Sequence, residues 1–395
     1  MKNIRIILFA LAAILVASCA PEKKEPHPQN VIYLIGDGMG FGAVSSLLLT
    51  EDSLTGFEKA PVIGLSETQS ANNHVTDSPA GGSALACGTR VKNGTLGLDP
   101  VDSTHLTSIL EKAQMMGKKT GIVVNTTLTE ATPAAFYANV KSRSMSYEIA
   151  RQFTESGVDV AIGAGLSAFI NRPDSLDLTR VLIEEKGYDV YLDWKSVLNT
   201  TSEKYVGILS MGDVHRRNKP TTAKPGAAAG DEVCLAAKLA ADAADQADTT
   251  IFSEPDLYLE KATAKALTAL EKNAPNGFFL MIESAIIDGY GHNNDSDGMI
   301  EEMQEFDNTL QMLIQYVNAH PGTLLVVTAD HETGGTGVGY KGHKVGEKAD
   351  VSLSFSTKGH TGTVVPIFAY GEGAEKFSGI MKNKDIPAKI EALIK

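Results

Sequence analysis

Short apolar runs rich in β-branched residues recur along the chain. They lie at 31–35, 121–124, 158–162, 278–282, 324–328 and 364–368. Runs of this length and composition indicate strands that are buried on both faces, as in a mostly parallel sheet. The pattern therefore predicts a central sheet whose strands come from distant parts of the chain.

Helical periodicity fills the intervals between these runs. Residues 103–116 carry apolar positions at helical spacing and stop at Gly117, and residues 257–270 separate an apolar from a charged face. Alternating strands and helices predict an α/β protein, a three-layer α/β/α sandwich around a large mostly parallel sheet, in one domain over 30–395. The segment at about 166–253 breaks the rhythm. We expect an insertion that decorates the rim of the functional site, with an alanine-rich surface helix or loop at 226–248.

The first residues are typical of a targeting segment. Lys2 and Arg5 accompany an apolar stretch at 6–16 that is too short to span a bilayer. Small residues lead directly into Cys19, as in bacterial lipoproteins, although an ordinary secretory signal is the alternative. We expect residues 1–18 to be removed, Cys19 to carry the lipid, and residues 19–29 to form a tether. The protein would then be lipid-anchored in the periplasm or at the cell surface.

The composition is that of an ordinary globular protein, with 43% hydrophobic residues, 21% charged residues and a net charge of −13. This charge argues against nucleic acid or an anionic membrane surface as a partner, apart from the lipid. An acidic protein that acts on an anionic substrate needs a local positive site, which clustered metal ions supply. Cys87 and Cys234 could pair in an exported protein, but Cys87 falls in a predicted buried helix, where a thiol is usually core.

Acidic and histidine residues stand at the ends of four apolar runs. They are Asp37, Glu283, Asp330 with His331, and His360. Asp288 and His292 follow Glu283 and are one helical turn apart, so both can face one ion. Because ligands bind beyond the carboxyl ends of parallel strands, the pattern predicts a site for several divalent cations.

Ser78 stands directly before Pro79, and proline favours the first turn of a helix. We therefore expect Ser78 to be a helix N-cap, beside unpaired N–H groups that stabilise an anion. Alone, this is an ordinary Ser-Pro helix start. Beside a set of metal ligands, Ser78 becomes a candidate functional residue.

Together these motifs resemble the alkaline phosphatase family, in the family's order and over residues 36–362. Any one of them is modest evidence, whereas the ordered set is specific. The set comprises Gly-Asp-Gly-Met-Gly at 36–40, Asp-Ser-Pro-Ala at 77–80, Glu-Ala-Thr-Pro-Ala at 130–134, Ser-Arg at 142–143, Glu283 with Asp288 and His292, Thr-Ala-Asp-His-Glu-Thr-Gly-Gly at 328–335, and Gly-His-Thr-Gly at 359–362.

The resemblance implies hydrolysis of phosphate monoesters through a phosphoserine at Ser78. It implies two zinc ions and one magnesium ion, and relatives of this kind are often homodimers. Arg143 would grip two phosphate oxygens in a bidentate fork. The implied ligands are Asp288, His292 and His360 for the first zinc, Asp37, Asp330 and His331 for the second, and Asp37, Thr132 and Glu283 for the magnesium.

Two positions depart from the family pattern. Gly289 stands where relatives often carry lysine, histidine or tryptophan near the phosphate, and Glu130 stands where aspartate or histidine is usual. Glu130 lies two residues before Thr132, so we expect its carboxylate near the magnesium or its waters. The histidines at 27, 74, 105, 215, 320 and 343 fall outside the motifs and are expected at the surface or in the tether.

Rival functions share parts of this pattern. A phosphodiesterase or phosphomutase would use the same superfold, but Arg143 and the magnesium set favour monoesters over diesters. A sulfatase would need an arginine four residues after Ser78, where Gly82 stands. A non-enzymatic lipid-anchored protein that binds metal or phosphate would explain the ligands, but not Ser78 among them.

Overall fold

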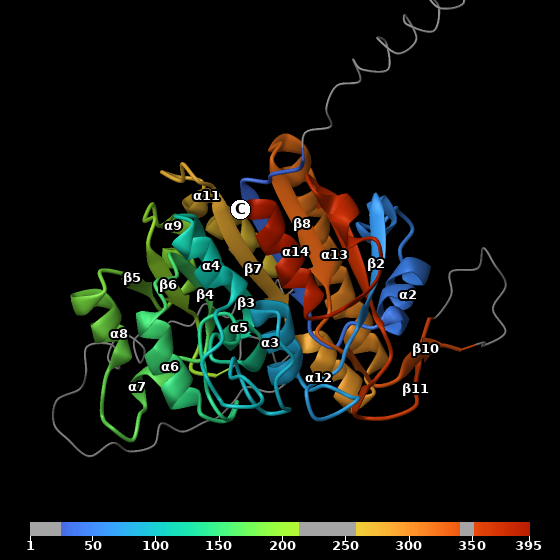
Figure 1. Ribbon diagram of the computed structural model, residues 1–395, viewed down its shortest axis with the longest axis horizontal. Coiled ribbons are helices and arrows are strands. Elements are labelled where there is room, and N and C mark those ends of the chain that lie inside the picture. Colours follow the sequence, from blue (N-terminus) through green and yellow to red (C-terminus); the bar gives the residue numbers. More distant parts are fainter. Residues whose placement is uncertain (1–24, 213–257, 340–350) are drawn as a thin grey trace, which may run out of the picture.

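The computed structural model describes residues 25–212, 258–339 and 351–395, and its centre is a ten-stranded sheet (Figure 1). The strand order is β14-β2-β13-β8-β1-β7-β3-β4-β6-β5. Within these residues, neighbouring strands of this sheet are parallel except where β13 pairs with β2 and β8. The strands are β1 Asn30–Gly36, β2 Val62–Glu67, β3 Lys119–Thr127, β4 Val160–Ala164, β5 Asp189–Tyr191, β6 Tyr205–Ile208, β7 Phe278–Ser284, β8 Thr323–Thr328, β13 Val365–Gly371 and β14 Gly379–Lys382.

Helices cover both faces of the sheet, which confirms the predicted α/β/α sandwich around a mostly parallel sheet (Figure 1). Two small antiparallel sheets pair β9 (Glu332–Thr333) with β12 (His360–Thr361) and β10 (Thr336–Val338) with β11 (Leu353–Phe355). The helices are α2 Phe41–Thr50, α3 Ser78–Cys87, α4 Ile109–Met115, α5 Ala131–Ala134, α6 Ser146–Glu155, α7 Ser167–Ile170, α8 Leu178–Arg180, α9 Trp194–Asn199, α11 Tyr258–Leu270, α12 Ile286–Asn293, α13 Ser296–Ala319 and α14 Asp385–Ile394.

The side chains of β1 alternate between two hydrophobic cores. Val31, Tyr33 and Ile35 pack with residues of α4, α6 and α14 on one face, whereas Ile32 and Leu34 pack with residues of α2, α11 and α13 on the other. Burying one large apolar side chain stabilises a fold by about 1.5–3 kcal/mol. Both faces are covered, so the run has no position for a solvated polar residue.

The register of the central strands brings the predicted acids to one edge of the sheet. Ile35 of β1 pairs with Glu283 of β7 and with Thr328 of β8. Asp37 and Asp330 therefore leave the sheet side by side, next to Glu283. Because β13 runs antiparallel to β8, its beginning lies at this same edge, which explains why His360 precedes its strand while the acids follow theirs.

The predicted helix at 103–116 begins later than the apolar spacing indicated. Its first residues form a loop, and α4 starts after Ser108. The Ser108 hydroxyl accepts from the Glu111 amide, and the Glu111 carboxylate accepts from the Ser108 amide. This capping box determines the start of the helix, which apolar periodicity alone misses.

The segment that breaks the strand–helix rhythm is described as far as residue 212. It carries α7, α8, α9, β5 and β6, and the two strands extend the edge of the main sheet beyond β4. Residues 213–257, including the alanine-rich stretch at 226–248 and Cys234, lie outside the described residues. The expected signal peptide at 1–18 and lipidated Cys19 lie outside them as well.

The described part of the expected tether meets the sheet. The amide of Gln29 donates to the carbonyl of Gly322, and Nδ1 of His27 lies 3.0 Å from the carbonyl oxygen of Leu393. Cys87 is buried in α3, as expected of a core residue, and forms no disulfide within the described residues. Among the described residues, we find no helix with the length and apolar character needed to cross a bilayer.

Candidate active site

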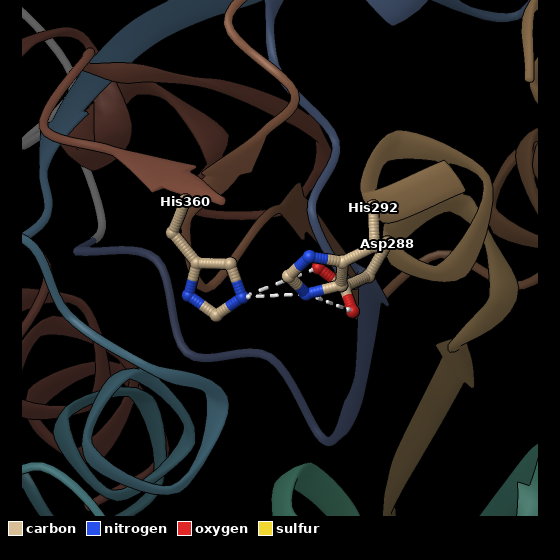
Figure 2. Close-up of side chains that lie close together, drawn as sticks. All are labelled: Asp288, His292 and His360. Carbon is tan, nitrogen blue, oxygen red and sulfur yellow. Dashed lines mark hydrogen bonds and ion pairs between the residues drawn. The ribbon is translucent and has the colours of Figure 1, made fainter. Parts of the chain in front are cut away.

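The first cluster brings together Asp288, His292 and His360 (Figure 2). Asp288 and His292 are one turn apart on α12, as their spacing predicted, and His360 begins β12. Nε2 of His292 lies 3.3 Å from Asp288 Oδ2, and Nε2 of His360 lies 3.4 Å from Asp288 Oδ1. The two Nε2 atoms are 3.1 Å apart. Atoms this close can coordinate one cation together.

The second cluster consists of Asp37, Asp330 and His331, all buried at the edge where β1 and β8 end. Nε2 of His331 lies 3.2 Å from Asp330 Oδ2 and 3.5 Å from Asp37 Oδ1. The rings of His331 and His360 stack with centroids 3.6 Å apart. The two clusters are therefore adjacent parts of one site.

The outer ring nitrogens of His292 and His360 face backbone carbonyl oxygens. Nδ1 of His292 lies 2.5 Å from the oxygen of Lys358, and Nδ1 of His360 lies 2.9 Å from that of Thr76. A carbonyl can only accept, so each Nδ1 carries a proton, and Nε2 is the ring nitrogen that remains to bind a cation in the site. Outer contacts of this kind orient imidazole ligands in metal sites.

Thr333 links the two clusters, a function that the sequence analysis did not assign. Its buried hydroxyl donates to Asp288 Oδ1 at 2.5 Å and lies 3.2 Å from Nδ1 of His331. Because the Thr333 hydroxyl donates its single hydrogen to Asp288, its oxygen accepts a hydrogen bond from His331 Nδ1–H. This leaves Nε2 of His331 free toward the ions. The only sequence signal was its position in the run 328–335.

The expected magnesium ligands are buried oxygen atoms that make no hydrogen bond within the described residues. They are Oδ1 of Asp37, Oγ1 of Thr132 and both carboxylate oxygens of Glu283. Buried polar atoms normally have partners, so such a group requires an explanation. Carboxylate and hydroxyl oxygens are ligands of hard cations. The donor set therefore fits a magnesium-like ion.

Burial gives the acids of the site unusual proton affinities. Burial, together with the charge of nearby carboxylates, raises the pKa of Glu283 to about 8 and that of Asp330 to about 7. Burial and the same neighbours raise the pKa of Asp37 well above its ordinary value. These acids cannot all ionise together without a countercharge. Divalent cations provide that countercharge.

Ser78 lies beside the second cluster, but it is not the helix N-cap that we predicted. The N-cap is Asp77, whose Oδ1 accepts from the Ala80 amide and whose Oδ2 accepts from the Gly94 amide. The aspartate takes the capping contact, and Ser78 becomes the first residue of α3. Its hydroxyl oxygen therefore reaches the site, 3.2 Å from Nε2 of His331.

Arg143 approaches the site from the loop before α6. Its backbone amide donates to the carbonyl of Gly94, and its guanidinium pairs with Glu130. Its positive charge lowers the pKa of Asp37, against the larger effect of burial. Glu130, expected near the magnesium set, is the N-cap of α5 and contacts Arg143 in this structure.

Gly289 leaves open space beside the first cluster, since a methyl group there would meet no atom within 4 Å. Of the other histidines, those at 27, 74, 105 and 320 belong to neither cluster, and those at 215 and 343 lie outside the described residues.

Comparison with known proteins agrees with this geometry. The family model for alkaline phosphatase matches residues 28–350. Alkaline phosphatase 4 of Bacillus subtilis is 27% identical over 96% of this chain and 92% of its own length. The alkaline phosphatase of the Antarctic bacterium TAB5 superposes with a TM-score of 0.79 at 32% identity, over 94% of this chain and 99% of that one.

A variant of the TAB5 enzyme, with glutamate in place of a histidine and magnesium bound in its M3 site, gives the same TM-score of 0.79 at 31% identity, over 94% of this chain and 99% of that one. Relatives that span nearly the whole chain identify it as a phosphatase enzyme. The matching family model, the shared fold and the two adjacent clusters of metal-binding side chains lead to one conclusion: the chain belongs to the alkaline phosphatase family.

Proposed function

We propose that the protein hydrolyses phosphate monoesters through a phosphoserine on Ser78. The observation that carries this proposal is the position of the Ser78 hydroxyl, buried and 3.2 Å from Nε2 of His331 in the second cluster. A serine that only helps to start a helix has no reason to lie among metal ligands. A serine among them fits a nucleophile that is activated by cations.

The two clusters would each hold a zinc ion, since imidazole nitrogen with carboxylate oxygen is a zinc-type donor set. Asp37, Thr132 and Glu283 would hold magnesium. When bound, the cations supply positive charge that favours the serine alkoxide and neutralises charge on the leaving oxygen. The unpaired buried oxygens of Asp37, Thr132 and Glu283 support this assignment.

The proposed reaction has two steps, transfer of the phosphoryl group to Ser78 and hydrolysis of the phosphoserine. Ser78 gives its hydroxyl proton to water, and its oxygen forms a bond to phosphorus while the bond from phosphorus to the alcohol oxygen breaks. The alcohol oxygen takes a proton from water as it leaves. A water molecule then attacks the phosphoserine, its proton returns to the Ser78 oxygen, and inorganic phosphate leaves. Arg143 holds two phosphate oxygens through both steps in a planar fork.

Glu130 would favour magnesium in the third site. The TAB5 variant with glutamate in place of histidine holds magnesium in its M3 site. We expect Glu130→His to bind zinc there instead, because imidazole suits zinc and a carboxylate suits a hard cation. Activity after zinc loading should be low and rise slowly with added magnesium. Metal analysis by mass spectrometry checks this, and a parent protein that holds three zinc ions would contradict it.

Phosphate release from p-nitrophenyl phosphate, measured against bis-p-nitrophenyl phosphate, tests the proposed function. We expect the zinc- and magnesium-loaded protein to prefer the monoester strongly. A preference for the diester would identify a phosphodiesterase. Tight binding of phosphate without turnover of either ester would identify a binding protein.

Arg143→Ala should lower kcat/KM for monoesters roughly 30- to 1,000-fold, since a charge-assisted contact of this kind contributes about 2–4 kcal/mol. Inhibition by phosphate should weaken in parallel. A diester offers the Arg143 guanidinium one fewer charged oxygen, so kcat/KM for diesters should fall much less. Arg151→Ala is the matched control, because Arg151 also pairs with a glutamate, Glu148, at the surface. Equal losses on both ester classes would show that Arg143 is structural.

Cys19→Ser should release an active, soluble enzyme. Cys19, the predicted lipidation site, precedes the first site residue, Asp37, in the sequence. Loss of the lipid should therefore leave the catalytic activity unchanged. Detergent phase partitioning measures the anchor, and a parent protein found in the aqueous phase would rule out the lipoprotein. The periplasmic or cell-surface location and the homodimer likewise stay predictions.

A further inference from the structure

A cavity of about 520 Å³ has Arg143 and Glu130 among its lining residues. The first residues of α6 and α7, Ser146, Tyr147, Ser167 and Ala168, line it as well. Neither the metal ligands nor Ser78 line it. Its size exceeds what phosphate needs, so it has room for another part of a substrate.

The lining of this cavity combines hydroxyl groups with small apolar surfaces. Hydroxyls come from Thr127, Thr129, Ser144, Ser146 and Ser167. Thr127, Thr129, Tyr147 and Ala168 also carry apolar groups. The charged lining residues are Glu130 and Arg143, and Arg143 is the one assigned to the phosphate, so the alcohol part would meet the hydroxyl groups. Such a lining fits a neutral ligand that alternates hydroxyl groups with C–H surface.

Tyr147 is held as a fixed aromatic platform. Arg172, 9% exposed, donates to the carbonyl oxygens of Tyr147 and Ala168 and makes two contacts with the Asp174 carboxylate. Its guanidinium also lies over the Tyr147 ring, 5.5 Å from the centroid. The buried arginine thus ties the start of α6 to the end of α7, while the Tyr147 side chain stays 40% exposed.

From this geometry we propose that the cavity is the subsite for the alcohol part of the substrate, and that it selects phosphate esters of polyhydroxylated alcohols, such as hexose phosphates. The hydroxyl set would exchange hydrogen bonds with the sugar hydroxyls, and the Tyr147 ring would pack against the C–H face of the sugar. Among the described lining residues Tyr147 is the one aromatic side chain, so a nucleobase would stack on one side only, whereas a sugar would also meet the hydroxyl groups. This inference rests on the proposed monoester hydrolysis.

The test compares kcat/KM for glucose 6-phosphate and ethyl phosphate. Both are esters of primary alcohols, so their ratio reports on recognition of the alcohol. We expect the parent enzyme to prefer glucose 6-phosphate at least tenfold. Tyr147→Ala and Ser167→Leu should each lower this ratio at least tenfold, the first by removing the platform and the second by filling the cavity from α7.

Two further variants separate recognition from folding. Tyr147→Phe keeps the ring and should stay within threefold of the parent ratio. Ile380→Ala removes an exposed apolar side chain from β14, at the opposite edge of the sheet. Its ratio should also stay within threefold of the parent ratio.

Three results would count against the subsite. An unchanged ratio in both Tyr147→Ala and Ser167→Leu, or no preference in the parent, would overturn it while leaving the proposed function intact. If Tyr147→Ala and Ser167→Leu lowered kcat/KM more for adenosine 5′-monophosphate than for glucose 6-phosphate, the choice of a hexose as ligand would be overturned. A parent enzyme that hydrolyses no monoester at all, p-nitrophenyl phosphate included, would overturn the proposed function itself.

Discussion

Ser78→Ala is expected to lower kcat for monoesters by about 10³-fold or more, the usual consequence of losing a covalent nucleophile. The fold should be unchanged, because Asp77 rather than Ser78 caps α3. The metal content should also be unchanged, since Ser78 belongs to neither cluster of metal-binding side chains. Steady-state kinetics on the metal-loaded variant, with metal analysis and a thermal melt, measure these three properties.

Ser83→Ala is the matched control for this prediction. Ser83 lies on the same helix, but its hydroxyl donates to the Pro79 carbonyl and accepts from the Gly97 amide. Its loss should cost about 1–3 kcal/mol of stability, because a buried amide loses its partner. It should leave kcat within a few-fold of the parent. Near-normal kcat in Ser78→Ala, or no phosphoserine trapped from the parent at acidic pH, would contradict the proposed mechanism.

Removal of the divalent cations is expected to make the stability of the protein fall as pH rises. Burial raises the folded-state pKa of Glu283 to about 8 and that of Asp330 to about 7. A carboxyl whose pKa is higher in the folded state binds its proton more tightly there. Its stabilising contribution is complete below the unfolded pKa, near 4, and is lost as pH rises to the folded value. Between about pH 4 and 8, these acids become buried, uncompensated charges.

Thermal melts of chelator-treated protein at several pH values measure this effect. Tm should fall between pH 5 and 8 by on the order of 5–10 °C, since each pKa unit corresponds to about 1.4 kcal/mol. Adding zinc and magnesium should abolish most of the fall, and Glu283→Gln, which cannot ionise, should reduce it in the metal-free protein. A metal-free protein that is more stable at pH 8 than at pH 5 would show that other groups dominate.

The start of a helix illustrates what sequence pattern cannot resolve. The run 103–116 has helical spacing throughout, yet the reciprocal contacts of Ser108 and Glu111 start α4 at residue 109. At Ser78 the presence of Pro79 located the helix to within one residue, but Asp77 took the cap. In both cases local side chains competed for the same amide groups. Apolar periodicity carries no information about that competition.

The sequence by itself determined the central strands and the edge at which the acids and histidines gather. Buried parallel strands require continuous apolar runs, and residues that follow them share one edge of the sheet. One-turn spacing likewise placed Asp288 and His292 together. These relations depend on local composition and on the general geometry of sheets and helices, so they can be read from the chain.

Only the tertiary structure decided how side chains from separate elements contact one another. Glu130 pairs with Arg143, and Thr333 joins Asp288 to His331, although neither pairing follows a repeat in the sequence. Beside the cavity, Arg172 donates to the carbonyl oxygens of Tyr147 in α6 and Ala168 in α7. Such contacts depend on the packing of whole elements and on small differences in the distances between atoms. Periodicity and spacing along one chain do not encode them.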